Sequence, residues 1–245
     1  MSSEKIAVKN VSKKIGKKTI LENISFNVHE GDICGFIGPN GAGKTTMIRV
    51  ITNLISPTEG EVTIDGANVV KERKTALLKL GAIVEEPIFF PYMSGRKNLQ
   101  NLAMLNPAMS KSEQKEKVEE VLKIVDLQDR GSDKVKTYSL GMKQRLGIAQ
   151  SLLNNPEVII LDEPANGLDP MGMRDLRELI FKLQKEEKIT FFISSHLLDE
   201  LQQLCNRFVV INKGKLIWQG SKDELESMGK SGRLEDAFIK LVSGC

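Results

Sequence analysis

One segment of this 245-residue chain constrains its fold more than any other: it runs from Gly38 to Thr45, with the sequence Gly-Pro-Asn-Gly-Ala-Gly-Lys-Thr. The segment fits the pattern Gly-x-x-x-x-Gly-Lys-Ser/Thr at every fixed position. An apolar run from Ile33 to Ile37 precedes it, and apolar residues spaced three and four apart follow it from Met47 to Ile55. A strand, a Gly-rich turn and a helix in this order predict a loop whose backbone N–H groups surround phosphate oxygens.

Most of the expected nucleotide contacts lie in or beside this loop. They are Gly38, Pro39, Asn40, Gly41, Ala42, Gly43, Lys44, Thr45 and Thr46. Lys44 supplies a positive charge for the outer phosphates, and the Thr45 hydroxyl can hold Mg²⁺. An ordinary Gly-rich turn is the alternative interpretation, and the flanking strand and helix argue against it.

A second motif is the apolar run from Val158 to Leu161, which ends in Asp162 and Glu163. A buried strand has little structural reason to end in two carboxylates, because the desolvation of an unpaired charge is costly. We expect Asp162 to hold Mg²⁺ and Glu163 to polarise the water that attacks the γ-phosphate. The alternative is a strand that simply ends in a solvated acidic turn.

The order of patterns along the chain predicts an α/β fold. Strands alternate with helices before residue 88 and after residue 155, which favours a mainly parallel sheet covered on both faces. Residues 88–155 are predicted to form a helical insertion, in which Ser110 and Glu113 make a capping box. We expect one domain over 1–245, with a core at about 1–87 and 156–220 and a C-terminal helical segment at about 221–245.

Composition excludes several classes of protein. With 40% hydrophobic and 27% charged residues, the chain is neither disordered nor fibrous, and its net charge of +3 requires no nucleic acid as a partner. No apolar run reaches the roughly 18 residues of a membrane span, and residues 1–5 lack the pattern of a signal peptide, so we expect a cytoplasmic protein. Cys34, Cys205 and Cys245 are scattered, which argues against a disulfide framework or a zinc site.

Three further segments identify a family. They are Ser139-Leu140-Gly141-Met142-Lys143-Gln144-Arg145, Asn166-Gly167-Leu168-Asp169 and Ser194-Ser195-His196. In this order and spacing, the chain resembles the ATP-binding subunit of an ABC transporter along essentially its whole length. The resemblance implies a P-loop NTPase of the ABC ATPase type, with an N-terminal antiparallel β subdomain and an inserted helical subdomain.

The resemblance also implies roles and partners. Ser139 and Gly141 would form a signature loop against the γ-phosphate held by a second ATP-binding subunit, Asp169 would lie in the loop that crosses between subunits, and His196 would contact the γ-phosphate and act in catalysis with Glu163. Taken alone, Ser139 would be an ordinary helix cap and His196 an ordinary surface or core histidine. ATP and Mg²⁺ are the implied cofactors. The implied partners are an integral membrane permease and an identical or different second subunit, arranged head to tail, so that this chain lies peripherally at the inner face of the cell membrane.

Three positions depart from the usual family pattern. Ile15 stands where most members have an aromatic ring that stacks on adenine, which predicts weaker nucleotide binding. Glu85 replaces a Gln that senses Mg²⁺, keeping an oxygen for the metal but adding a charge. Leu140 replaces a Gly of the signature loop.

These departures resemble one subgroup, the bacitracin-resistance and lantibiotic-immunity transporters. Glu85, the Ser139–Ala149 stretch and the ending Leu234–Phe238 carry this resemblance. It implies a subunit that powers a separate permease to export antimicrobial peptides or similar drugs. Two alternatives stay open: a catalytically weak regulatory ATP-binding module of a heteromeric transporter, and an ABC ATPase that acts outside transport.

Overall fold

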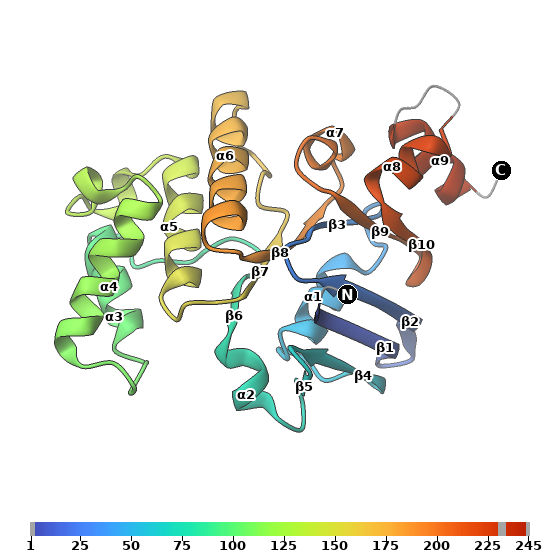
Figure 1. Ribbon diagram of the computed structural model, residues 1–245, viewed down its shortest axis with the longest axis horizontal. Coiled ribbons are helices and arrows are strands. Elements are labelled where there is room, and N and C mark those ends of the chain that lie inside the picture. The colour runs from blue at the N-terminus through green and yellow to red at the C-terminus, as the bar shows by residue number, and fades with distance from the viewer. Residues whose placement is uncertain (1–2, 230–233, 244–245) are drawn as a thin grey trace.

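The computed structural model of the chain describes residues 3–229 and 234–243 (Figure 1). Cys245, one of the scattered cysteines, lies outside the described residues. Two sheets and the helices around them make up the described part. Helices α3 (Gly95–Ala103), α4 (Lys111–Ile124) and α5 (Leu140–Leu152) gather at one end of the molecule, and α8 (Lys222–Ser227) and α9 (Leu234–Ser243) lie at the other.

The larger sheet contains the expected parallel core. Its strand order is β10 (Lys215–Ser221), β9 (Arg207–Asn212), β3 (Ile33–Ile37), β8 (Thr190–Ser195), β7 (Val158–Asp162) and β6 (Leu80–Ile83). Neighbours from β9 to β6 are parallel, whereas β10 pairs antiparallel with β9. Ile37 aligns with Ser195, and Asp162 aligns with Ser194. The register therefore brings the end of β3, where the Gly-rich loop begins, beside the ends of β8 and β7.

The smaller sheet is antiparallel and built mainly from the N-terminal part of the chain, as expected. Its order is β2 (Lys18–His29), β1 (Glu4–Ile15), β4 (Glu59–Ile64) and β5 (Ala67–Asn68). The short helix α2 (Arg73–Leu78) leads from it to β6.

Helix α1 (Lys44–Ile51) contacts strands of both sheets, namely β2, β4 and β7. Its Met47, Ile48 and Ile51 side chains are fully buried and share a core cluster with Phe26 of β2 and Phe192 of β8. The two phenylalanine rings stack with centroids 5.6 Å apart. Burial of each large apolar side chain contributes about 1.5–3 kcal/mol. This packing fixes the axis of α1, and with it the position of the helix N-terminus.

A charge network also joins the two sheets. The buried Lys5 of β1 places its Nζ 3.0 Å from Asp65 Oδ1 and 2.6 Å from Glu157 Oε2, next to the start of β7. Lys79, just before β6, pairs with the same two carboxylates. Because Lys5 is buried, losing either carboxylate would leave its charge poorly compensated.

The helical insertion lies between β6 and β7 in the chain, as predicted. It comprises α3 (Gly95–Ala103), α4 (Lys111–Ile124), two short 3₁₀ turns at Gln128–Arg130 and Val135–Thr137, and α5 (Leu140–Leu152). The Ser110–Glu113 capping box is confirmed. The apolar face of α4, with Val118, Val121 and Leu122, is buried in the core cluster that also includes the inner residues of α3 and α5.

Helices α6 (Pro170–Glu186) and α7 (Leu198–Gln202) flank β8 in the chain, and α8 (Lys222–Ser227) and α9 (Leu234–Ser243) follow β10. Leu234 and Ala237 of α9 are buried in the main core cluster, and Asn212 Nδ2 donates to the Val242 carbonyl at 3.2 Å. The apolar face of α9 therefore packs on its own domain. Within the two described ranges, no helix combines the length and apolar character that a membrane span requires.

Candidate functional site

The Gly-rich loop follows β3 and closes over the start of α1. Ala42 N donates to Pro39 O at 3.0 Å, which tightens the turn. Gly43 has φ +108°, and a Cβ there would lie 2.8 Å from Leu21 Cδ2. At Gly38, a Cβ would lie 2.4 Å from the Ile211 carbonyl oxygen. Both positions therefore require glycine, one for its backbone conformation and the other for the close approach of β9.

The loop is also tied to two strands that are distant from it in sequence. Gly214 N, in the β9–β10 turn, donates to Ala42 O at 2.9 Å, and Gly214 O accepts from Glu22 N of β2 at 2.8 Å. Gly214 has φ +77°, and a Cβ there would lie 2.2 Å from Ile20 O. The β9–β10 turn thus links the phosphate loop to the antiparallel sheet.

The first turn of α1 is arranged to receive an anion. Its N-cap is Gly43, which has no side chain to cap the first N–H groups, and the first turn contains no acidic residue. Lys44 is 7% exposed, and its Nζ donates to Gly38 O at 2.9 Å. Free N–H groups, the helix dipole and a buried ammonium group therefore meet at one point, which is the arrangement that binds phosphate.

Asp162 and Ser194 form a second part of the site, at the ends of β7 and β8. Asp162 is buried, and Ser194 Oγ donates to its Oδ1 at 2.5 Å. Ser194 Oγ also accepts from Glu163 N at 2.9 Å. One hydroxyl therefore orients the Asp162 carboxylate and fixes the backbone of Glu163. The sequence pattern places Ser194 in the Ser194-Ser195-His196 segment but does not predict this double role.

Glu163 lies between a lysine and a histidine. Its Oε1 is 3.3 Å from Lys44 Nζ, and its Oε2 is 2.7 Å from His196 Nδ1 and accepts from His196 N at 3.3 Å. Glu163 has φ +49°, which turns its side chain out of the strand direction. The structure thus brings together the two predicted catalytic residues and the predicted phosphate lysine.

The three residues predicted to hold Mg²⁺ have different surroundings. The Thr45 hydroxyl, in the first turn of α1, and the Asp162 carboxylate, at the end of β7, are oxygen donors near the same sheet edge. Mg²⁺ prefers oxygen ligands and usually takes only one or two from carboxylates, so this donor set fits the ion. Among the described residues, no cluster of three or more His, Cys, Asp or Glu could hold a metal alone. Glu85 pairs with Arg49 of α1, and its side chain is 60% exposed; its role toward Mg²⁺ stays a prediction.

The signature-loop residues lie together in a different place. Ser139 caps α5, because its Oγ accepts from Met142 N at 3.2 Å, and Asp169 caps α6, because its Oδ1 accepts from Gly172 N at 2.8 Å. Ser139, Gly141 and Asp169 all line one hollow of about 410 Å³. None of the described residues that line it belongs to the phosphate loop. One chain thus carries two separate surfaces for the predicted nucleotide contacts.

The hollow has further features that the sequence motifs do not predict. Gln144 lines it with a side chain that is 5% exposed and whose Oε1 has no hydrogen-bond partner. Arg145 and Asp175 form an ion pair of 2.5 Å at its edge. Leu140 lies close to the following loop, since a Cβ on Gly167 would be 3.1 Å from Leu140 Cδ2. The helical spacing of buried residues on α5 could have indicated that Gln144 is buried. The Arg145–Asp175 pair, in contrast, depends on how α5 packs against α6.

The other predicted contacts lie at the rim. Ile15 is 56% exposed at the end of β1, next to the turn at Gly16. Asn40 is exposed, and Thr46 is half-buried in α1. Within the described part of the chain, neither Ile15 nor Asn40 forms a hydrogen bond or ion pair with Lys44 or Glu163, so their roles remain predictions.

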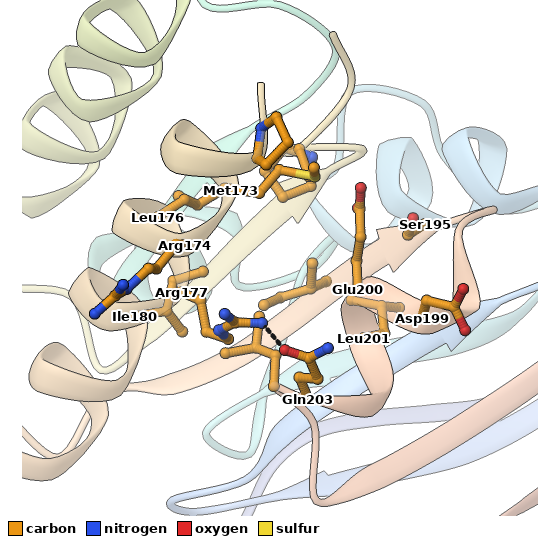
Figure 2. Close-up of a pocket in the computed structure, with 15 residues that line it drawn as sticks. Met173, Arg174, Leu176, Arg177, Ile180, Ser195, Asp199, Glu200, Leu201 and Gln203 are labelled. Carbon is orange, nitrogen blue, oxygen red and sulfur yellow. Dashed lines mark hydrogen bonds between the residues drawn. The ribbon is translucent and has the colours of Figure 1, made fainter. Parts of the chain in front are cut away.

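A smaller hollow of about 300 Å³ lies between α6 and α7, behind the segment that follows Glu163 (Figure 2). Glu200 and Ser195 line it together with residues of α6 such as Met173. Burial raises the pKa of Glu200; His196 lowers this pKa and the negative Glu163 raises it further. The surroundings of Glu200 are therefore electrostatically connected to the Glu163–His196 pair.

Comparisons with known proteins agree with this geometry. Residues 21–166 match the sequence model of the ABC transporter family. The bacitracin transport ATP-binding protein BcrA of Bacillus licheniformis is 44% identical over 92% of this chain and 72% of its own length. The lantibiotic transport ATP-binding protein SrtF of Streptococcus pyogenes is 39% identical over 91% of this chain and 93% of its own.

Solved structures agree as well. A dimeric ATP-binding cassette in a post-hydrolysis state, bound to ADP and Pi, superposes with a TM-score of 0.77 at 29% identity, covering 89% of this chain and 98% of that one. The family match over residues 21–166 includes the phosphate loop, the Asp162–Glu163 strand end and the signature segment. The chain belongs to the ABC transporter family and is an ATP-binding, ATP-hydrolysing subunit of that family.

Proposed function

We propose that this subunit hydrolyses ATP to power a separate membrane permease that exports membrane-active peptide antibiotics or similar drugs. The observation that carries the ATPase part is the contact chain from Lys44 through Glu163 to His196 at the end of the phosphate loop. The peptide-antibiotic part is supported by the relatives, which are described as transporting bacitracin and a lantibiotic.

Two copies, or this chain and a related one, would meet head to tail. Lys44 and Asp162 of one subunit and Ser139 of the other would then enclose each ATP. The separation of the two surfaces on one chain supports this arrangement, because the signature hollow has no phosphate loop of its own. The first-turn N–H groups of α5 that the Ser139 side chain does not cap would face the nucleotide of the other subunit.

Within each site, the residues divide the chemical work. Lys44 and the first turn of α1 bind and orient the phosphates, and Glu163 accepts the proton of the attacking water. His196 holds Glu163 in place through Nδ1 and hydrogen-bonds the terminal phosphate. Thr45 and Asp162 would hold Mg²⁺, which supplies positive charge to the phosphate oxygens. Ile15 would contact adenine with aliphatic atoms only, and Glu85 would offer an oxygen to the metal or its water near the permease.

The permease would dock beside Glu85, at the start of the helical insertion. Ile88, Phe90 and Tyr92 are 92%, 51% and 62% exposed, and the last two rings lie 5.9 Å apart. We call Phe90 and Tyr92 the aromatic patch. The buried Asn98 fixes it, since its Oδ1 accepts from Phe90 N at 2.8 Å and its Nδ2 donates to Phe90 O at 3.2 Å. An exposed apolar patch on a rigid support is typical of a protein interface.

The chain organisation follows from this division. Residues 1–87 and 156–220 would form the nucleotide-binding core, 88–155 the helical subdomain that moves with the permease, and 221–245 a C-terminal segment. The subunit would act at the inner face of the cell membrane, held there by the permease.

The test is a resistance assay. A strain that lacks this gene is complemented with wild type or with Glu163→Gln, and minimal inhibitory concentrations are measured for bacitracin, a lantibiotic and an unrelated ribosome inhibitor. We expect wild type alone to raise tolerance to one or both peptides by several-fold. Equal tolerance with both forms would overturn the transport proposal. It would also favour the weak regulatory module, provided that purified wild type binds but does not hydrolyse ATP.

A further inference from the structure

A hollow of about 440 Å³ lies between α3 and α4, away from both nucleotide surfaces. It is lined by Lys97, Gln100, Asn101, Met104, Lys111, Gln114 and Lys115. Three of these side chains are lysines, contributed by two helices, and no carboxylate lines the hollow among the described residues. We call it the lysine hollow.

The charges of the lysine hollow are not compensated within the described part of the chain. Lys97, Lys111 and Lys115 are exposed and have no ion pair there. Cations nearby behave differently, since Lys117 pairs with Glu120 at 2.8 Å and Arg96 pairs with Glu119 at 2.6 Å. Like charges around one concave surface repel each other, so this arrangement contributes nothing to folding.

The carboxylates closest in sequence are used elsewhere. Glu113 Oε2 accepts from Ser110 N at 2.7 Å in the capping box, and Glu116 Oε1 accepts from Ser112 Oγ at 3.0 Å. Both contacts lie on α4 but outside the hollow. The positive charge is therefore open to an acidic group from another molecule.

The lysine hollow adjoins the aromatic patch. Asn101, which lines the hollow, places its Nδ2 3.4 Å from the Sδ of Met93, directly after the segment that carries Phe90 and Tyr92. Met104, which also lines the hollow, and the following Leu105 are 63% and 77% exposed. Exposed apolar side chains thus lie next to a positive concavity.

We propose that the lysine hollow receives an acidic, amphipathic segment of a cytoplasmic loop of the permease. This inference rests on the proposed function, because it specifies the chemistry of the partner at the docking surface. Asp or Glu side chains of that segment pair with the three lysines, while apolar side chains on the same segment cover Met104 and the aromatic patch. Such charge pairing speeds association and fixes the register of the partner.

The shape and the lining favour a protein segment over a lipid surface. A bilayer is flat on this scale, and its headgroups do not follow a concavity between two helices. Gln100 and Gln114 offer amide groups inside the hollow. The Gln114 Nε2 is already satisfied by Asn106 O and Met109 O, which leaves its Oε1 to accept from a partner.

The experiment uses the subunit co-expressed with its permease and purified in detergent. A zero-length carbodiimide links ammonium groups to carboxylates in contact, and mass spectrometry maps the links. We expect Lys97, Lys111 or Lys115 to be joined to Asp or Glu of one cytoplasmic loop. Links confined to other lysines of this chain would overturn the proposal.

Charge reversal provides the second measurement. The variant Lys97→Glu, Lys111→Glu, Lys115→Glu should bind the permease at least tenfold more weakly, and lysines at the cross-linked acidic positions should restore binding. The matched control reverses Lys74, Lys123 and Lys185, which are equally exposed and lie on α2, α4 and α6. Both variants should bind nucleotide like wild type.

The outcomes separate the possible failures. If wild type does not hold a permease at all, the proposed function fails. If wild type holds it and both triple variants bind equally well, this inference fails alone. The last measurement tests binding to vesicles of pure phosphatidylglycerol and of phosphatidylcholine. If charge reversal at the lysine hollow abolishes binding to the anionic vesicles but not to the permease, the hollow binds a lipid surface and the proposal is wrong.

Discussion

Lys44 and Glu163 form an ion pair with Nζ and Oε1 3.3 Å apart, and their side chains are only 7% and 23% exposed. The pair joins the phosphate-binding charge to the predicted catalytic carboxylate. Because His196 Nδ1 contacts the other oxygen of Glu163, both oxygens have a defined direction. Binding of phosphate to Lys44 therefore changes the electrostatic surroundings of the residue that is to accept a proton.

Replacement of Glu163 by Gln should separate binding from hydrolysis. The change keeps the shape of the side chain but removes the proton acceptor, so we expect ATP turnover to fall by about 100-fold or more while nucleotide binding remains. Phosphate release by the permease complex and binding of a fluorescent ATP analogue measure the two effects. Glu187→Gln, at an exposed position just after α6, is the control. Unchanged turnover in Glu163→Gln would remove the assigned role.

Removal of the Ser194 hydroxyl should destabilise the site indirectly, through the two residues that this hydroxyl holds in place. In Ser194→Ala, Asp162 Oδ1 and Glu163 N lose a buried partner, so the free energy of unfolding should fall by about 1–3 kcal/mol. Magnesium-dependent nucleotide affinity should fall as well. Ser194→Thr keeps the hydroxyl on a strand where a β-branched residue fits. This variant should therefore retain most of the stability and most of the magnesium-dependent nucleotide affinity. Denaturant unfolding and titration with and without Mg²⁺ test this; equal behaviour of the Ala and Thr variants would contradict it.

An aromatic ring at position 15 should strengthen nucleotide binding. In Ile15→Tyr, the ring is available for stacking on adenine, and such stacking contributes about 0.5–1.5 kcal/mol. We therefore expect ATP to bind roughly 2- to 10-fold more tightly, as measured by calorimetry with Mg²⁺ present. Val70→Tyr places the same ring at another exposed site and should leave affinity unchanged. Identical affinities for wild type and Ile15→Tyr would place adenine elsewhere.

The network around Lys5 should make stability depend on acid pH. Hydrogen bonding to Lys5 is the main cause that lowers the pKa of both Asp65 and Glu157. A carboxyl with a lowered pKa in the folded state stabilises the protein above its unfolded pKa, near 4, and loses this contribution as pH falls through the folded value. Both carboxylates are more than a third exposed, so solvent screening limits the contribution to about 1 kcal/mol.

Glu157→Gln should accordingly reduce the free energy of unfolding by about that amount at pH 7 and by much less at pH 3. Urea unfolding at the two pH values checks this, with Glu187→Gln as the control at an exposed position. A constant difference between Glu157→Gln and wild type at both pH values would mean that packing, not charge, is responsible.

Local sequence patterns predicted the parts of this molecule that depend on nearby residues. The phosphate loop, the strand that ends at Asp162 and the cap of α5 by Ser139 are each determined by residues a few positions apart. The parallel core followed from alternating strands and helices, and the family resemblance supplied the antiparallel sheet.

The rest depends on which elements become neighbours. The double role of Ser194 exists only because β7 and β8 are adjacent and in register. The Arg49–Glu85 pair requires α1 to lie beside the end of β6, and the lysine hollow requires α3 to pack on α4. A sequence gives the residues of such contacts but not the packing that joins them.

The tie between Ala42, Gly214 and Glu22 has a practical consequence for anyone who modifies this protein. The turn at Gly214 is a short connection between two strands, and it would be an obvious site for inserting an epitope or a reporter. It nevertheless supports the phosphate loop through the hydrogen bond from Gly214 N to Ala42 O. An insertion there would be expected to impair ATP binding without altering any residue that touches ATP, and the damage could be mistaken for misfolding.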